Sequence, residues 1–241
     1  VAVEDMLSGN RFGDAGSTVV IEEFMEGEEA SLLAFVDGKT VVPMIASQDH
    51  KRIFDGDKGP NTGGMGTYAP APVLTDTLRD EAMKTILEPM VAAMQKEGMP
   101  YVGCLYAGLM ITPKGPKVVE FNARFGDPET QVVLPLLDSD LGQIMMACAT
   151  GTLTADMVKW KDSSAACVIL ASKGYPETSS KGDVIHGDIK QHDTTIVFHS
   201  GTKLVGEEYV TNGGRVLGVV GLGKDLRTAL DRAYGRIEHI D

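Results

Sequence analysis

Cysteine is scarce in this chain of 241 residues, and its three cysteines form no recognisable pair. Cys104, Cys148 and Cys167 lie far apart in apolar runs, and the chain has no CxxC or Cys/His spacing typical of a metal site. This scarcity argues against disulfides and against a zinc site. We therefore expect buried, free thiols and a reducing compartment.

Positive charge is also in short supply. The 22 Lys and Arg are outnumbered by 34 Asp and Glu, which gives a formal net charge of −12. An acidic surface argues against nucleic acid or a membrane surface as a partner, although local Lys and Arg can still form a site for an anionic substrate. The sequence has no apolar run of membrane-spanning length and opens with no signal peptide, so the cytoplasm is the predicted location.

What the chain does contain is an ordinary globular composition, with 43% hydrophobic and 23% charged residues. Its length allows one large domain or two smaller ones. The opening segment places Val3, Met6 and Leu7 at helical spacing with no upstream cap, which is typical of the end of a longer helix. Because the sequence also stops without an evident terminating element, we expect a fragment of a longer protein.

Hydrophobic periodicity predicts the elements. Runs rich in β-branched and apolar residues predict strands at 18–25, 29–36, 40–46, 103–111, 117–122, 165–171 and 215–220. Apolar residues at helical spacing predict helices at 75–98, 139–150 and 226–237. The Gly- and Pro-rich stretch 47–72 is predicted to be a long functional loop. Short strands and Gly-rich turns dominate after about residue 160, so we predict two domains, 1–160 and 161–241.

The most informative stretch is VVEFNARFGDPET, residues 118–130. Side chains two apart in a strand share a face, so Glu120, Asn122 and Arg124 should point the same way. A carboxylate, an amide oxygen and a guanidinium suit Mg²⁺ held against a nucleotide phosphate, because Mg²⁺ takes few protein oxygens and Arg binds phosphate with two parallel hydrogen bonds. A solvated edge strand with an incidental ion pair is the alternative.

Two other segments carry candidate binding residues. In the stretch 47–72, Lys51 and Arg52 supply positive charge, and the Gly63–Gly66 cluster lets an anion approach successive backbone N–H groups. A mobile surface loop with a chance glycine cluster is the alternative. The segment VVIEEFMEGEEAS, residues 19–31, could bind adenine with its backbone and ribose with a carboxylate; on its own it indicates more simply a strand with a solvated acidic end.

In this order, the segments VVIEEFMEGEEAS, QDHKR with DGDKGPNTGGMG, LYAGLM, and VVEFNARFGDPETQ closely resemble the glycinamide ribonucleotide synthetase family. The resemblance runs from about Phe12 to the end of the chain. It implies an α+β fold of the ATP-grasp type. The large ATP-grasp subdomain, a mostly antiparallel sheet with helices, would be followed by a small α/β C-terminal domain.

The resemblance also implies an activity, the ATP-dependent joining of 5-phosphoribosylamine and glycine through glycyl phosphate. The products are glycinamide ribonucleotide, ADP and phosphate, a step of purine biosynthesis. The implied cofactors are ATP and Mg²⁺ or Mn²⁺. The implied partners are the small-molecule substrates, with no nucleic acid or membrane, and the implied assembly is a monomer or weak dimer.

Carried over residue by residue, the resemblance implies metal ligands at Glu120 and Asn122. Arg124 and Asp127 take the catalytic positions, with Arg124 on the phosphates or the acyl phosphate and Asp127 beside the substrates. The implied adenine and ribose site consists of Glu22, Glu23, Met25 and Glu29. The implied site for glycine and phosphoribosylamine consists of Asp49, Lys51, Arg52, Gly63, Gly64 and Gly66.

One departure from the family pattern limits these expectations. The family's N-terminal domain and the Gly-rich lid with its ATP-binding lysine should precede residue 1, so we expect this chain alone to hold only part of the ATP site and to be inactive. Two alternatives stay open. The first is another ATP-grasp ligase or carboxylase of the purine pathway, and the second is a non-catalytic nucleotide-binding fragment.

Overall fold

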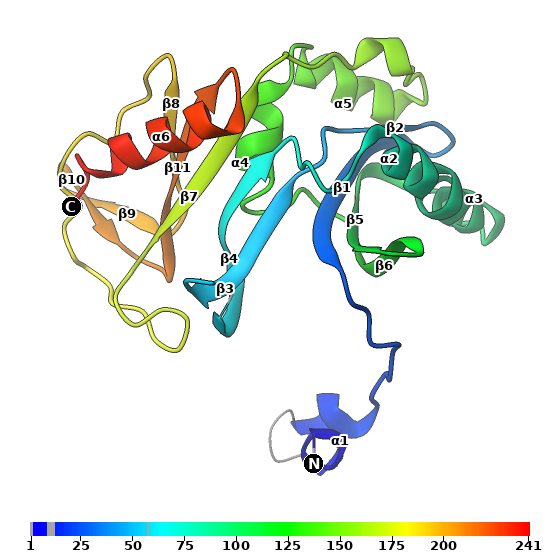
Figure 1. Cartoon of the computed structure of the whole chain (residues 1–241), viewed down its shortest axis with the longest axis horizontal. Helices are drawn as coiled ribbons and strands as arrows, with labels where there is room; N and C mark the ends of the chain where they lie inside the picture. The colour runs from blue at the N-terminus through cyan, green and yellow to red at the C-terminus, as the bar shows by residue number, and fades with distance from the viewer. Residues whose placement is uncertain (1, 9–12, 57) are drawn as a thin grey trace.

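The computed structural model describes residues 2–8, 13–56 and 58–241, which contain two larger antiparallel sheets with helices around them (Figure 1). The first sheet has the strand order β2-β1-β5-β6. Its strands are β1 (Glu28–Asp37), β2 (Val41–Pro43), β5 (Val102–Thr112) and β6 (Gly115–Asn122).

The second sheet has the order β3-β4-β7-β11-β8. Its strands are β3 (Gln48–Phe54), β4 (Lys58–Ala69), β7 (Ser164–Ala171), β8 (Thr195–His199) and β11 (Arg215–Gly223). A separate hairpin is formed by β9 (Thr202–Val205) and β10 (Glu208–Thr211). Because β4 pairs with β7, this sheet joins parts of the chain on both sides of residue 160, and the division into 1–160 and 161–241 stays a prediction.

Helical segments flank both sheets (Figure 1). One continuous segment consists of α2 (Asp76–Ala82), the π-helical η2 (Met83–Leu87) and α3 (Glu88–Lys96). A second group consists of α4 (Thr130–Val133), η3 (Leu134–Leu136) and α5 (Leu141–Thr150). The helix α6 (Leu226–Ile237) packs on β7 and β11. The remaining short elements are α1 (Ala2–Leu7), η1 (Gly13–Ser17) and η4 (Ala155–Met157).

The strand β1 is buried on both faces, so it separates two cores. Leu32, Ala34 and Val36 point to one face, where they pack with Leu87 and Val91 of the α2–α3 segment. The other face contributes Leu33 and Phe35 to the core that also holds Val132, Ile144 and Cys148. The first residues of β1, Glu28 and Glu29, are exposed, so the strand begins in a polar region.

Most of the predicted elements are confirmed. The helix predicted at 226–237 has those bounds in the structure because Asp225 caps it, its carboxylate accepting the Thr228 N–H at 2.8 Å. The strands predicted at 29–36, 103–111, 117–122, 165–171 and 215–220 lie within β1, β5, β6, β7 and β11. The helix predicted at 139–150 begins two residues later, after the cap Asp140, and the strand predicted at 40–46 shortens to β2.

The helix predicted at 75–98 is interrupted by a π turn. Pro89 has no N–H to donate to the carbonyl of the preceding turn, so regular α-helical bonding cannot continue through it. The wider turn accommodates this, and the Glu88 N–H donates to the Met83 carbonyl, five residues earlier.

Two predictions were wrong. The segment 18–25 is not a strand: it runs irregularly from η1 towards β1 (Figure 1), with Val20, Ile21 and Phe24 exposed by 82%, 79% and 86%. Among the described residues no strand pairs with it. The stretch 47–72 is not a loop but mainly the β3–β4 hairpin, whose turn includes Asp55 and Gly56.

The predicted state of the cysteines is confirmed. Cys104, Cys148 and Cys167 are free and buried. Burial raises the pKa of Cys104 and of Cys167 to about 12, which leaves both thiols protonated and unreactive at neutral pH. As for membrane insertion, no helix in the described part of the chain is long and apolar enough to span a bilayer.

Candidate functional site

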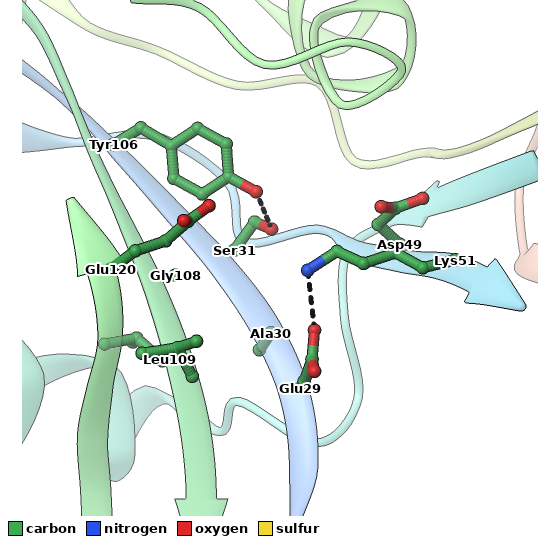
Figure 2. A pocket seen from close by; sticks show the side chains of 10 residues that line it. Glu29, Ala30, Ser31, Asp49, Lys51, Tyr106, Gly108, Leu109 and Glu120 are labelled. Atoms are coloured by element: carbon green, nitrogen blue, oxygen red, sulfur yellow. Dashed lines mark hydrogen bonds and ion pairs between the residues drawn. The ribbon is translucent and has the colours of Figure 1, made fainter. Parts of the chain in front are cut away.

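The beginning of β1 and the neighbouring strands β5 and β6 form the floor of a small cavity (Figure 2). Ser31 of β1 lies opposite Gly108 of β5, which lies opposite Glu120 of β6. Residues paired across antiparallel strands share a face, so Ser31 and Glu120 point to the same side of the sheet. Gly108 keeps the floor open between them, since a Cβ there would lie 3.4 Å from Glu120 Cγ.

The predicted metal ligands lie together on β6, and Glu120 lines the cavity. Glu120 and Asn122 point to one face of β6, and Asn122 Nδ2 donates to Glu120 Oε1 at 3.0 Å. Their oxygens are hard donors of the kind that Mg²⁺ prefers, and Mg²⁺ needs only one or two ligands from protein when phosphate and water supply the rest. No group of three acidic, His or Cys side chains in the described residues forms a fuller metal site. The pair therefore fits the metal that the resemblance implies.

The β3–β4 hairpin forms one side of the cavity. Asp49 and Lys51 share a face of β3 and line the cavity, and Lys51 Nζ lies 2.8 Å from Glu29 Oε2 of β1 (Figure 2). The pair is partly exposed, so it contributes less than about 1 kcal/mol and can open when an anion arrives. A wider cavity of about 360 Å³ adjoins this one, and Glu29, Asp49 and Lys51 line both cavities. Arg52 also lines the wider cavity, and it donates to the Gly59 carbonyl of the hairpin at 2.6 Å.

Asp49 is a strongly perturbed acid. Its Oδ1 atom is buried without a hydrogen-bond partner among the described residues. Burial, and after it the nearby charge of Glu129, raise the pKa of Asp49 from 3.8 to about 7. Lys51 and Arg215 act in the opposite direction without cancelling the shift. The carboxyl group can therefore both hold and release a proton near neutral pH.

The raised pKa of Asp49 gives a testable pH dependence. A folded-state pKa above the unfolded value means that the folded protein binds more protons, so stability falls as pH rises from about 4 to about 8. We expect Asp49→Asn to remove this part of the decline. Urea unfolding across that pH range should show a shallower slope for Asp49→Asn than for the unchanged chain or for Asp55→Asn, at the exposed hairpin turn. Equal slopes would contradict the assignment.

A buried polar network behind Asp49 was missed by sequence analysis. The Glu129 carboxylate, only 3% exposed, accepts from Tyr106 OH at 2.5 Å and from Ser31 Oγ at 3.3 Å. Burial and the charge of Glu129 raise the pKa of Tyr106, which keeps the phenol a donor. Ser31 and Tyr106 lie in apolar stretches far from Glu129 in the sequence, so no local pattern identifies the network.

The other predicted catalytic and substrate residues lie at the end of β6 and in β4. Arg124 is exposed, and its guanidinium donates to the Phe125 carbonyl at 2.9 Å. Asp127 accepts from Gln131 Nε2 at 2.6 Å and pairs with Arg215. The N–H groups of Gly63 and Gly64 already donate to protein oxygens, so the expected anion-binding nest has no free donor at these two positions. That Arg124, Asp127 and these glycines contact the substrates stays a prediction.

The residues predicted to bind adenine and ribose do not all lie at the cavity. Glu29 lines the cavity, whereas Glu22, Glu23 and Met25 lie on the irregular segment that precedes β1. Glu23 accepts Lys117 Nζ at 2.7 Å, and this hydrogen bond lowers the pKa of the Glu23 carboxyl. The ion pair ties the segment to β6, on which the metal residues lie.

Comparison with known proteins identifies the family. Residues 1–130 match the family description "Phosphoribosylglycinamide synthetase, ATP-grasp (A) domain", and residues 165–241 match the C domain of the same family. A phosphoribosylamine–glycine ligase of Caulobacter vibrioides is 56% identical over 99% of this chain and 56% of its own length. The chain thus spans about half the length of the curated relatives it matches.

Solved structures agree on the architecture. A phosphoribosylamine–glycine ligase from Thermotoga maritima superposes with a TM-score of 0.85 at 32% identity, over 100% of this chain and 60% of that one. The biotin carboxylase domain of a Hydrogenobacter thermophilus 2-oxoglutarate carboxylase shares the fold alone, with a TM-score of 0.72 at 14% identity over 100% of this chain and 51% of that one. The predicted α+β ATP-grasp fold is confirmed. By the family descriptions that cover both parts of its sequence, this chain belongs to the phosphoribosylglycinamide synthetase family.

Proposed function

We propose that this chain provides metal-, phosphate- and substrate-binding residues of an ATP-dependent ligase that joins 5-phosphoribosylamine to glycine. The products would be glycinamide ribonucleotide, ADP and phosphate. The observation that carries the proposal is the cavity that Glu120 lines together with Asp49 and Lys51, with Asn122 hydrogen-bonded to Glu120. The names of relatives at 50–56% identity support the choice of reaction.

Under this proposal each residue of the site has a distinct role. Glu120 and Asn122 would hold Mg²⁺ or Mn²⁺, which when bound neutralises charge on the ATP phosphates. Arg124, free on its solvent side, would bind phosphate oxygens with its planar fork. Lys51 would leave Glu29 for an anionic group, and Glu29 would then be free to accept from the ribose hydroxyls of ATP.

Asp49 and Asp127 would face the substrate amines. A carboxyl group with a pKa of about 7 suits an amine that must be held and must lose a proton as the amide forms. Glu22, Glu23 and Met25 would border the adenine, with Arg52 and the glycines of β4 shaping the substrate side. The proposal places the protein in the cytoplasm as a monomer or weak dimer, with 1–160 as the ATP-grasp part and 161–241 as a C-terminal domain.

Product formation by a full-length protein that contains this chain tests the proposal. We expect ADP release that requires both glycine and phosphoribosylamine, and no release when bicarbonate replaces glycine. ADP release with bicarbonate but not glycine would favour a carboxylase instead. The chain of 241 residues alone should form no product and should bind ATP–Mg²⁺ weakly by calorimetry, because it spans about half the length of its relatives. Micromolar ATP binding by this chain would mean that its ATP site is more complete than we propose.

A further inference from the structure

Two side chains from the C-terminal part of the chain hold one residue of the β3–β4 hairpin, Gly63, by both of its backbone polar groups. The Gly63 N–H donates to Tyr175 OH at 3.0 Å, and the Gly63 carbonyl accepts from Arg215 NH1 at 2.6 Å. Both polar groups of this residue are therefore fixed by residues more than 100 positions away in the sequence. None of the residues assigned to the site above has this role.

Arg215 also fixes Asp127. Its NH1 atom donates to the Asp127 carbonyl at 2.9 Å, and its NH2 atom lies 3.3 Å from Asp127 Oδ2. The side chain of Arg215 is only 21% exposed, so the guanidinium is largely enclosed by the groups it contacts. One guanidinium thus connects the hairpin to the segment that follows β6. The single ammonium group of Lys could not make the same set of hydrogen bonds.

The identity of Gly63 follows from this arrangement. The backbone of Gly63 does not have a positive φ, so conformation alone does not require glycine there. A Cβ at this position would lie 3.0 Å from Arg215 Cζ and 3.1 Å from its Nε and NH2 atoms. The guanidinium therefore lies against the bare Cα of Gly63. The next residue, Gly64, packs closely on the Asp49 carboxylate, since a Cβ there would lie 2.8 Å from Asp49 Oδ1, so Gly63 is one residue away from the perturbed acid.

Tyr175 and Arg215 emerge from the same corner of the second sheet. Arg215 begins β11 and pairs with Ala171, the last residue of β7, while Tyr175 follows β7 in a turn closed by its N–H to the Ser172 carbonyl at 3.2 Å. Ser172 N–H in turn donates to the Gly214 carbonyl at 2.8 Å. These backbone contacts fix the positions from which both side chains extend to the hairpin.

We propose that Arg215 and Tyr175 are positioning residues of the substrate site. They hold the backbone of Gly63, and Arg215 also holds Asp127, in the arrangement that binds glycine and phosphoribosylamine. The proposal rests on the function proposed above. It assigns to the C-terminal part of the chain a direct influence on substrate affinity, with no contact to ATP.

The first test measures the hairpin without any substrate. Tyr175→Phe removes only the hydroxyl that accepts the Gly63 N–H. We expect amide hydrogen exchange at Gly63, followed by NMR on this chain, to accelerate about tenfold, as for loss of one hydrogen bond. Tyr209→Phe, whose ring lies 4.5 Å from that of His199, is the matched control and should leave the exchange unchanged. Unchanged exchange in Tyr175→Phe would overturn the proposal whatever reaction the protein catalyses.

The second test measures substrate affinity in a full-length protein that contains this chain. Tyr175→Phe should raise KM for glycine or phosphoribosylamine about three- to tenfold, and Arg215→Gln more, while KM for ATP stays within about twofold. Arg215→Lys should recover part of the loss, and Gly63→Ala should give the Arg215→Gln pattern because it displaces the guanidinium. Arg227→Gln, which breaks an exposed pair with Asp231 on α6, is the arginine control.

The outcomes separate this proposal from the proposed function. If all three KM values rise together, or if none changes in Tyr175→Phe, the two residues are merely structural and the proposal is wrong. If the unaltered full-length protein makes no product, the proposed function fails, while the exchange measurement still decides whether Tyr175 holds Gly63. If Arg215→Gln does not fold, as judged by thermal unfolding, Tyr175→Phe remains the deciding variant because it deletes a single oxygen.

Discussion

Replacing Glu120 with glutamine should lower product formation about a hundredfold or more in a full-length protein that contains this chain. Glutamine keeps the size of the side chain but removes the negative charge that would hold the metal against the ATP phosphates. Because Glu120 is exposed to the cavity and packs in neither core, the substitution should leave folding intact. The rate should be measured over a wide range of Mg²⁺ concentrations, since a weakened metal site shifts that dependence to higher metal.

A matched control is Glu88→Gln, at the exposed start of α3, which lines neither of the cavities described above. It removes the same charge from the same acidic protein and should leave the rate unchanged. A Glu120→Gln protein with normal turnover at saturating Mg²⁺ would show that Glu120 is an ordinary exposed acid. Loss of cooperative unfolding in the variant would instead assign it a structural role.

Replacing Gly64 with alanine should destabilise the folded chain by about 3 kcal/mol. Gly64 has a φ of +110°, which an L residue rarely adopts, and a Cβ there would lie 2.5 Å from Pro128 Cδ and 2.8 Å from Asp49 Oδ1. Neither neighbour can move easily, because Pro128 is a ring within the main chain and Asp49 is enclosed. Urea unfolding of the two proteins measures the difference.

The control for Gly64 is Gly98→Ala, after α3. Gly98 also has a positive φ, +73°, but a Cβ there would meet nothing within 4 Å. This variant should lose only the conformational part, about 1 kcal/mol. The difference between the two variants isolates the close packing of Pro128 and Asp49 on Gly64. Equal losses would mean that the packing can relax and that only backbone strain matters.

The sequence predicts structure correctly where local chemistry decides it. The helix α6 begins at the predicted residue, Leu226, where Asp225 caps it, and the alternation in β6 places Glu120 and Asn122 on one face without help from the rest of the chain. The hairpin escaped prediction because β4 is rich in glycine, which disfavours strands in isolation, and its pairing partner β7 lies far along the chain. Segment 18–25 failed for the opposite reason: its residues favour a strand, but the described residues offer no strand to pair with it.

The candidate site also contains residues that could be predicted from the sequence and contacts that could not. Glu120, Asn122, Asp49 and Lys51 were predicted from their own segments. The structure brings Glu120, Asp49 and Lys51 around a single cavity, with Asn122 hydrogen-bonded to Glu120. The Glu129–Tyr106–Ser31 network and the Arg215 contacts could not be predicted, because each joins segments that only the tertiary fold brings together.

The pairing of β4 with β7 has a consequence for how the chain folds. Gly66 lies opposite Val168, so this part of the second sheet closes a loop of about 100 residues, and contacts at such separation form late because the chain must first lose much of its freedom. During synthesis the β3–β4 hairpin emerges long before β7, and until then one edge of the glycine-rich strand β4 lacks its partner β7. In that interval the edge is open to other chains, so we expect aggregation to be most frequent while the ribosome has not yet made β7.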